Sequence, residues 1–110
     1  MLLRIDVEED GNRRVVRLGG ECDLSTAPQL QEALGPMRAP DVNEIIVDVS
    51  QLSFMDSTGL GVLVGALKRV RESEGQFKIA GAQGAVARVL EVSGLDRIIP
   101  QFPSVEAAKA

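Results

Sequence analysis

Residues 44–70 decide the fold and read EIIVDVSQLSFMDSTGLGVLVGALKRV. The run from Glu44 to Ser50 is rich in β-branched residues and apolar on both faces near its centre, which is typical of a buried central strand in a parallel sheet. A loop is expected at 51–56. From Ser57 onward, apolar side chains recur at helical spacing, at Leu60, Leu63, Val64, Leu67 and Val70. A buried strand followed by an amphipathic helix predicts an α/β fold with parallel strands.

An antiparallel hairpin is expected before this unit. Residues 3–7 alternate apolar and charged side chains, which indicates a half-exposed edge strand. The pair Asp10-Gly11 is a strong hairpin-turn signal, and a second strand resumes at 15–18 and ends by Gly20.

A first helix is expected after a loop at residues 20–25. Ser25 or Thr26 is suited to cap this helix, and Pro28 falls in its first turn, where a missing N–H costs nothing. The apolar stripe of the helix consists of Leu30, Ala33, Leu34 and Met37, and its end is bracketed by Pro36 and Pro40.

The C-terminal part continues the alternation of strands and helices. Gly75 is expected to stop the long helix. The remaining elements are a strand at 77–80, a helix at 84–93 ended by Gly94, a short strand at 98–99 and a terminal helical turn at 105–108. The order β-β-α-β-α-β-α-β-α predicts one α/β domain over residues 1–110, with helices packed around a mixed, mostly parallel sheet that carries an antiparallel N-terminal edge strand.

Composition excludes several classes of function. The chain has 110 residues, 45% of them hydrophobic, and a net charge of −4. An acidic domain is a poor binder of nucleic-acid phosphates, so no direct nucleic-acid partner is expected. The absence of histidine removes histidine metal sites and histidine-activated nucleophiles, and the single Cys22 removes disulfides and zinc clusters. We therefore expect no metal, no cofactor and no enzymatic activity.

The sequence also predicts neither a membrane-spanning segment nor a signal peptide. The charge-free stretch from Ser57 to Leu67 is eleven residues long, whereas a spanning helix needs about 20 apolar residues. The first ten residues carry charge by Arg4 and contain no apolar signal-peptide region. The expectation is a cytoplasmic protein with no membrane span.

Two loops are candidates for function, at residues 20–25 and 53–59. Ligands and partners of open α/β sheets usually bind beyond the carboxyl ends of the strands. Because neighbouring parallel strands end at the same edge, we expect Asp23 to lie near Ser57. Asp23 has a plain structural reading as well, as a cap of the first helix, for which Ser25 and Thr26 are equally suited.

The start of the long helix has unusual chemistry. Capping by Asp56 or Ser57 would explain these polar residues without any function. The glycines at 59, 61 and 65 need a further reason, because each costs a helix about 1 kcal/mol relative to alanine. We expect Gly61 and Gly65 to allow close packing on the sheet, and Gly59 to leave the helix end bare for another protein.

A hydroxyl at such a helix start is also suited to carry a phosphate. Free N–H groups and the helix dipole favour an anion there. Phosphorylation would add a charge of about −1.5 to −2. The domain would stay folded, and the added charge would act on a docked partner.

The sequence resembles a known family at these positions. Residues 54–61, Phe-Met-Asp-Ser-Thr-Gly-Leu-Gly, are similar to the signature of the bacterial anti-sigma factor antagonists, whose domain is called STAS. Residues 20–23 resemble the Gly-Glu-Leu-Asp turn of that family, with Cys22 in place of leucine. Residues 92–95, followed by Ile98 and Ile99, are similar to its last helix and strand. The resemblance covers nearly the whole chain.

The resemblance implies a phosphorylation-controlled binding protein. In that family the unphosphorylated antagonist binds an anti-sigma factor that is also a serine protein kinase, and so frees the sigma factor. Phosphorylation ends the binding, and a PP2C-type phosphatase restores it. By resemblance Ser57 is the phosphorylated residue, although Thr58 stands where many relatives have serine. The implied partner-binding residues are Asp23, Ser25, Asp56, Ser57, Thr58, Gly59 and Gly61, and the free chain is expected to be a monomer.

Other functions remain open at this point. The same fold would serve a non-switching STAS subunit of a larger signalling or transporter complex. An enzyme with Ser57 as nucleophile would need an adjacent base, and the nearest lysine in sequence, Lys68, lies three helical turns away. Nucleotide binding would need a glycine-rich loop with a lysine, which the chain lacks. Phe54, Met55 and Cys22 are interpreted as core or loop anchors rather than contact residues.

Overall fold

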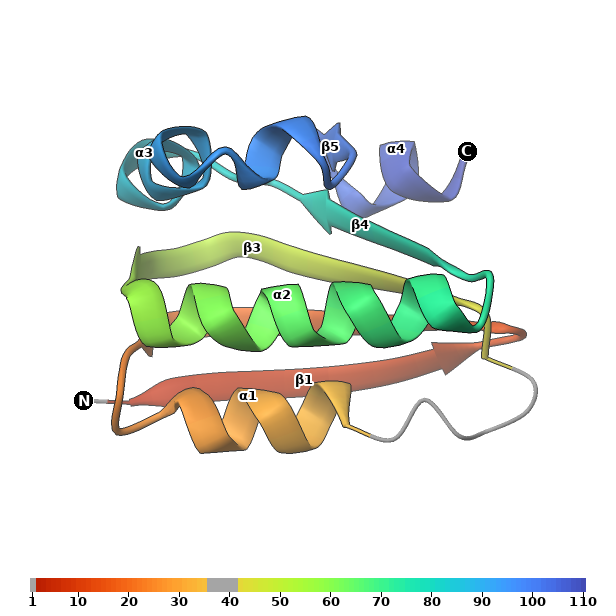
Figure 1. The fold of residues 1–110 in the computed structure, drawn as a ribbon, viewed down its shortest axis with the longest axis horizontal. Helices are drawn as coiled ribbons and strands as arrows, with labels where there is room; N and C mark the ends of the chain where they lie inside the picture. Colours follow the sequence, from red (N-terminus) through yellow and green to blue (C-terminus); the bar gives the residue numbers. More distant parts are fainter. Residues whose placement is uncertain (1, 36–41) are drawn as a thin grey trace.

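The structure is a computed structural model that describes residues 2–35 and 42–110. This part of the chain forms a five-stranded sheet in the order β1-β2-β3-β4-β5, with helices packed on it (Figure 1). The pairing of β1 with β2 is antiparallel and all other pairings are parallel, as the sequence predicted. In chain order the elements are β1 (Leu3–Asp10), β2 (Arg13–Cys22), α1 (Ala27–Leu34), β3 (Glu44–Met55), α2 (Ser57–Glu72), β4 (Gln76–Ala80), α3 (Gly84–Ser93), a 3-10 turn (Leu95–Arg97), β5 (Gln101–Phe102) and α4 (Val105–Lys109).

The main core lies between the sheet and the helices α1, α2 and α3. Alternate strand residues such as Val16 and Val47 point into it and are fully buried. Helix α2 contributes its buried stripe, including Leu63 and Ala66. Figure 1 shows α1 and α2 side by side on this face, along the length of the sheet. The start of α2 therefore rests on a rigid platform.

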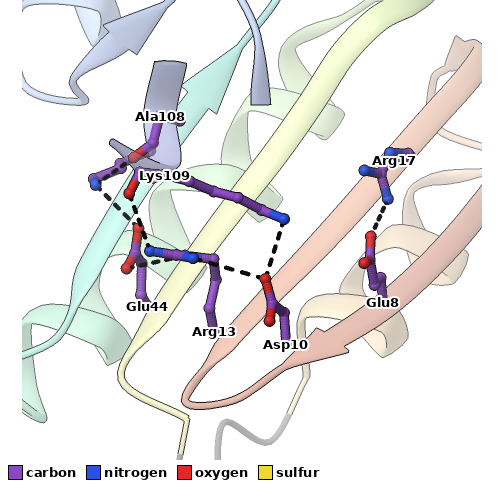
Figure 2. A network of polar contacts seen from close by, with 8 residues as sticks. Glu8, Asp10, Arg13, Arg17, Glu44, Ala108 and Lys109 are labelled. Atoms are coloured by element: carbon purple, nitrogen blue, oxygen red, sulfur yellow. Dashed lines mark hydrogen bonds and ion pairs between the residues drawn. The ribbon is translucent and has the colours of Figure 1, made fainter. Parts of the chain in front are cut away.

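The opposite face of the sheet carries charges that alternate from strand to strand. Figure 2 shows acidic residues of β1 and β3 on either side of arginines of β2. Buried Glu44 pairs with Arg13 at 3.3 Å and with Lys78 at 3.0 Å, and Arg17 pairs with Glu8 at 2.6 Å. The charged side chains of each strand lie next to side chains of opposite charge on the neighbouring strand. This face therefore stays polar without burying unpaired charge.

Helix α4 covers a small apolar cluster on the same polar face. Val105 and Ala108 pack on Val15, Ile46 and Ala80. The last turn of α4 is held by cations, since Lys78 Nζ donates to the Ala108 carbonyl at 2.7 Å and Arg13 to the Lys109 carbonyl at 3.4 Å. Positive charge at a helix C-terminus is favourable.

The strands that carry the candidate loops run longer than predicted. Part of the expected loop at 20–25 belongs to β2, and most of the expected loop at 51–56 belongs to β3. The reason is tertiary, because the β2–β3 ladder continues past two register shifts to pair Glu21 with Phe54 and Cys22 with Met55. The loops that remain are short and stand directly on the sheet edge.

One smaller prediction is wrong. Ile98 and Ile99 form no strand, because the 3-10 turn redirects the chain and buries Ile99, and β5 follows at 101–102. Helix α2 ends at Glu72, shortly before Gly75, and the left-handed residue that follows the helix is Glu74, with φ of +60°. A Cβ at Gly75 would instead lie 2.6 Å from the Asn43 carbonyl oxygen, so glycine is required there by close approach. Residues Pro36, Met37 and Pro40 lie outside the described residues.

Candidate functional site

The two candidate loops meet at one edge of the sheet. The last residues of β2 and β3, Cys22 and Met55, are paired in the parallel ladder. Directly after them, the Asp56 N–H donates to the Cys22 carbonyl at 3.1 Å. Asp23 follows Cys22 in the chain, and Ser57 follows Asp56. The expectation that the two loops share one edge is therefore confirmed.

Helix α2 begins at this edge with Asp56 as its N-cap. The Asp56 carboxylate accepts hydrogen bonds from the N–H groups of Thr58 at 2.9 Å and Gly59 at 3.2 Å. This confirms the capping prediction for Asp56. It also changes the expectation of a bare helix end, because two of the N–H groups at the start of α2 already have a partner within the protein.

Ser57 and Thr58 differ in accessibility. Ser57, the first residue of α2, is exposed, and its hydroxyl has no hydrogen-bond partner within residues 2–35 and 42–110. Thr58 is half-buried and lines a groove of about 220 Å³ between α1 and α2, together with Gln31, Gly61, Val62, Gly65 and Arg69. An enzyme that approaches the helix start reaches the Ser57 hydroxyl first.

Asp23 shapes the turn that precedes α1. One oxygen of its carboxylate accepts from the Ser25 hydroxyl at 2.7 Å and from the N–H groups of Ser25 at 2.9 Å and Thr26 at 3.1 Å. These hydrogen bonds, above all that of the Ser25 hydroxyl, lower the pKa of Asp23, although desolvation acts in the opposite direction. Asp23 therefore stays ionised at this edge.

The predicted cap of α1 by a side chain is not observed. Thr26 occupies the N-cap position but is buried, and its hydroxyl donates to the Glu21 carbonyl at 3.0 Å instead. The same oxygen accepts from the Asp23 N–H at 2.9 Å. Thr26 thus folds the turn back onto the end of β2. Pro28 does lie in the first turn of α1, as predicted.

The glycines of α2 have roles opposite to those expected. Gly59 is buried, and a Cβ there would lie 2.7 Å from Cys22 Sγ and 3.0 Å from Met55 Cγ. The idea that Gly59 leaves the helix end open to a partner is wrong, because it allows α2 to approach β2. A Cβ at Gly61 would meet nothing within 4 Å, and one at Gly65 only Arg69. Neither glycine packs on the sheet.

Cys22 is a buried part of this packing, as expected. Burial raises the pKa of its thiol to about 11, and the nearby carboxylates of Asp56 and Asp23 add to the increase. A thiol that stays protonated and has no access to solvent is a small apolar side chain. The structure gives Cys22 no reactive role.

Other kinds of site are not indicated by the described residues. Residues 2–35 and 42–110 contain no group of three metal-ligating side chains. No helix in this part of the chain is long and apolar enough to cross a membrane.

Comparison with known proteins agrees with this fold. The STAS domain family matches residues 4–108. This chain belongs to the STAS domain family. The anti-sigma-B factor antagonist of Staphylococcus aureus strain NCTC 8325 is 38% identical over 95 residues, which cover 86% of this chain and 88% of that relative.

Two solved structures show the likeness of this STAS domain in space. The anti-sigma factor antagonist SpoIIAA in its unphosphorylated form has a TM-score of 0.83 at 26% identity, over 96% of this chain and 92% of that chain. The Bacillus cell fate determinant SpoIIAA in the phosphorylated form has a TM-score of 0.74 at 25% identity, over 96% and 97%. A relative with this fold is thus known in both phosphorylation states.

Two residues of the STAS domain edge were missed or misjudged from sequence. Phe54, interpreted as an anchor, is 40% exposed, whereas Met55 is buried. Leu24 was not considered and is 74% exposed. The sequence did not separate Phe54 from Met55, because both were expected in a loop; in the structure β3 continues to Met55, and alternation along the strand directs Phe54 to the other face.

Proposed function

We propose that this STAS domain is an anti-sigma factor antagonist whose binding to an anti-sigma factor is ended by phosphorylation of Ser57. The observation that carries the proposal is the exposed Ser57 hydroxyl, at the first position of a helix that is anchored in the core, which has no hydrogen-bond partner among the described residues. Curated relatives are named as antagonists, and SpoIIAA is known in both phosphorylation states. The chain is accordingly a regulatory binding protein and not an enzyme.

The partner in this proposal is an anti-sigma factor that is also a serine protein kinase. It would contact the sheet edge formed by Asp23, Ser25, Asp56, Ser57, Thr58 and Gly61. Gly59 would support this edge as a buried packing residue. A PP2C-type phosphatase would return the protein to its binding form. The free protein would be a monomer, and a cytoplasmic location follows because the kinase uses ATP and sigma factors act on transcription.

The switch follows from the charge at this edge. A phosphate on Ser57 would add a charge of about −1.5 to −2 beside the carboxylate of Asp56. Two nearby N–H groups already bind Asp56, so the phosphate gains from the helix dipole but finds few free donors. A kinase active site holds the phosphates of its nucleotide, and these anions repel the new dianion. The repulsion favours release of the phosphorylated protein.

The domain itself is expected to tolerate the phosphate. Helix α2 is fixed by a buried stripe that includes Leu63, Ala66 and Val70, none of which touches the solvent side. The added charge at the helix N-terminus is favourable to the helix dipole. The effect therefore falls on the partner and not on folding.

The test uses the cognate kinase, ATP and three variants at positions 57 and 58. Incubation should place one phosphate on the peptide that contains Ser57, identified by mass spectrometry. Ser57→Ala should bind the kinase and accept no phosphate, while the matched control Thr58→Ala should be phosphorylated like the wild type. Ser57→Asp should fold normally and lose the kinase.

Two results would contradict the proposal. Phosphate on Thr58 would move the site by one residue. Wild-type, Ser57→Ala and Ser57→Asp proteins that all bind equally would show a non-switching interaction subunit instead.

A further inference from the structure

The ladder of hydrogen bonds between β4 and β5 stops before it reaches the start of β4. The Ile79 N–H donates to the Pro100 carbonyl at 3.0 Å, on the side of β4 that faces β5. Two residues earlier on β4, the same pattern would join the Phe77 N–H to the Ile98 carbonyl. Within residues 2–35 and 42–110 that bond is not made. The first part of β4 is therefore an unpaired strand edge.

Two neighbouring residues explain why the ladder stops. The Ile98 carbonyl, which would be the acceptor, already accepts a hydrogen bond from Arg71 Nη2 at 3.0 Å. The N–H that would bind the Phe77 carbonyl in a parallel ladder is that of residue 100, which is a proline and has no N–H. The break thus follows from the sequence and needs no distortion of the sheet.

The backbone polar groups of Phe77 point away from β3 and toward this edge. The preceding residue, Gln76, donates its N–H to the Asn43 carbonyl on the β3 side at 2.8 Å. Successive residues of a strand direct their N–H and C=O groups to opposite sides. Phe77 is only 3% exposed, and among the described residues neither its N–H nor its C=O has a hydrogen-bond partner. Such groups are normally paired, so a ligand at this edge can complete them.

A pocket of about 280 Å³ lies at this edge. Figure 1 shows that α2 ends and β4 begins at the opposite end of the molecule from Ser57. The pocket is large enough for one apolar side chain and its backbone, and none of the side chains that line it is acidic. The lining residues are Leu67, Arg71, Gly75, Gln76, Phe77, Lys78, Ile98 and Pro100.

Arg71 supplies the available positive charge of this pocket. Its side chain makes one hydrogen bond within the described residues, to the Ile98 carbonyl, and it takes part in no ion pair there. A guanidinium has five N–H donors, so others remain for a carboxylate. The ammonium of Lys78 is already engaged, by Glu44 at 3.0 Å and by the Ala108 carbonyl at 2.7 Å.

We propose that this pocket binds the C-terminal end of a protein chain whose last residue is apolar. The free carboxylate of such a chain end would bind Arg71, its backbone would pair with Phe77, and its last side chain would lie against the apolar wall of the pocket. The occupant follows from charge complementarity, because the pocket has a cation without an ion pair and no acidic side chain. Strand addition and capture of a terminal carboxylate are both recurrent ways to recognise peptides.

The bound chain end would occupy the place beside β4 that β5 leaves free. A carbonyl of the bound chain would accept from the Phe77 N–H, and one of its N–H groups would donate to the Phe77 carbonyl. The side chain opposite Phe77 would lie on the same sheet face as Phe77. That face is covered by α2, which carries both Leu67 and Arg71. One helix therefore supplies the apolar contact and the charge.

The experiment titrates the protein, labelled with nitrogen-15, with the peptide acetyl-Ala-Ala-Leu and follows the backbone amides by NMR. The matched peptide has the same sequence and a C-terminal amide in place of the carboxylate. We expect the free-acid peptide to shift the Phe77 amide proton downfield, as a new hydrogen bond does. The amidated peptide should bind about tenfold more weakly, because it loses the charge-assisted hydrogen bonds to Arg71.

Two exposed substitutions test the pocket from the side of the protein. Arg71→Gln should weaken binding of the free-acid peptide about tenfold. Ile98→Glu should weaken it at least as much, because it places a carboxylate beside Arg71, and Ile98 is 45% exposed. The controls are Arg69→Gln, at an arginine of α2 that lines a different groove, and Val92→Glu, at a 74% exposed position on α3. Both controls should bind like the wild type, and all four variants should keep its melting temperature.

Three results would overturn this proposal. Equal affinity for the free-acid and amidated peptides would show that Arg71 does not recognise the chain end. An equal loss in Arg69→Gln and Arg71→Gln would show only a general attraction of an anion to a basic helix. A Phe77 amide that stays unshifted at peptide concentrations up to about 10 mM would place no peptide at this edge. None of these results bears on phosphorylation of Ser57, so the proposed function stands or fails separately.

Discussion

A Cβ added to Gly59 of α2 would lie 2.7 Å from the Sγ of Cys22, closer than real carbon and sulfur atoms approach. Gly59 is therefore the residue that lets the start of α2 rest on the end of β2. The same contact fixes the height of Ser57, two residues earlier, above the sheet edge. Packing beneath the helix thus positions the hydroxyl that the proposed switch uses.

Gly59→Ala should destabilise the fold although alanine is the better helix former. The gain in helix propensity is about 1 kcal/mol, whereas forcing a methyl group into this contact costs typically about 1–3 kcal/mol. We expect a net loss of up to about 2 kcal/mol in the free energy of unfolding, measured by urea denaturation. Gly61→Ala is the matched control and should gain about 0.5–1 kcal/mol, since open space surrounds that position. Equal effects of the two substitutions would refute the packing role.

A second prediction concerns Glu44, which neutralises two cations beneath α4 (Figure 2). Glu44→Gln leaves the partly buried Lys78 without a counter-charge and leaves Arg13 only its pair with Asp10 at 3.7 Å, and breaking such a buried pair costs about 3 kcal/mol. Unfolding in urea measures the loss, and amide exchange in α4 should accelerate because both cations hold its carbonyls. Glu8→Gln is the control. Its pair with Arg17 is half-exposed, so a change of less than about 1 kcal/mol is expected.

A third prediction follows from the turn around Asp23. The Ser25 hydroxyl is the largest cause of the low pKa of Asp23. Ser25→Ala should therefore raise that pKa toward its ordinary value, as followed by carboxyl-carbon NMR during an acid titration. Ser53→Ala is the control, because the Ser53 hydroxyl binds the Gly20 carbonyl and not a carboxylate. An unchanged Asp23 titration in Ser25→Ala would show that the backbone N–H groups alone hold the charge.

The order of the elements could be predicted because their signals are local. The β-branched run at 44–50 and the helical spacing after Ser57 do not depend on other segments. The ends of β2 and β3 could not be predicted, since residues 51–55 mix polar and apolar side chains and are extended through their pairing with residues 19–22. The pair Ile98-Ile99 illustrates the same limit, because neither residue joins a strand: Ile99 is buried in the core, whereas Ile98 is 45% exposed.

The sequence placed the two candidate loops at one edge of the sheet, as the structure has them, but it assigned the glycines of α2 to the wrong faces of the helix. Gly59 precedes Leu63 by four residues and Ala66 by seven, so it lies on the buried stripe of α2. Gly61 falls outside that stripe. Extending the helical period one turn toward the N-terminus would have separated the two. The exposure of Leu24 had no sequence signal, since it depends on how Thr26 and Asp23 fold the turn.

The last prediction concerns alkaline pH and Cys22. Burial raises the pKa of its thiol to about 11 in the folded state, compared with an ordinary value of 9.0. Because the folded pKa is the higher one, the stabilisation is fully present below pH 9 and is lost as the pH rises toward 11. Urea unfolding between these pH values should lose up to about 2 kcal/mol more for the wild type than for Cys22→Ala, which has no thiol to ionise. The comparison of the two proteins cancels the titration of lysines and arginines. Parallel pH profiles would mean that the thiol reaches solvent and that the contact with Gly59 is looser than 2.7 Å suggests.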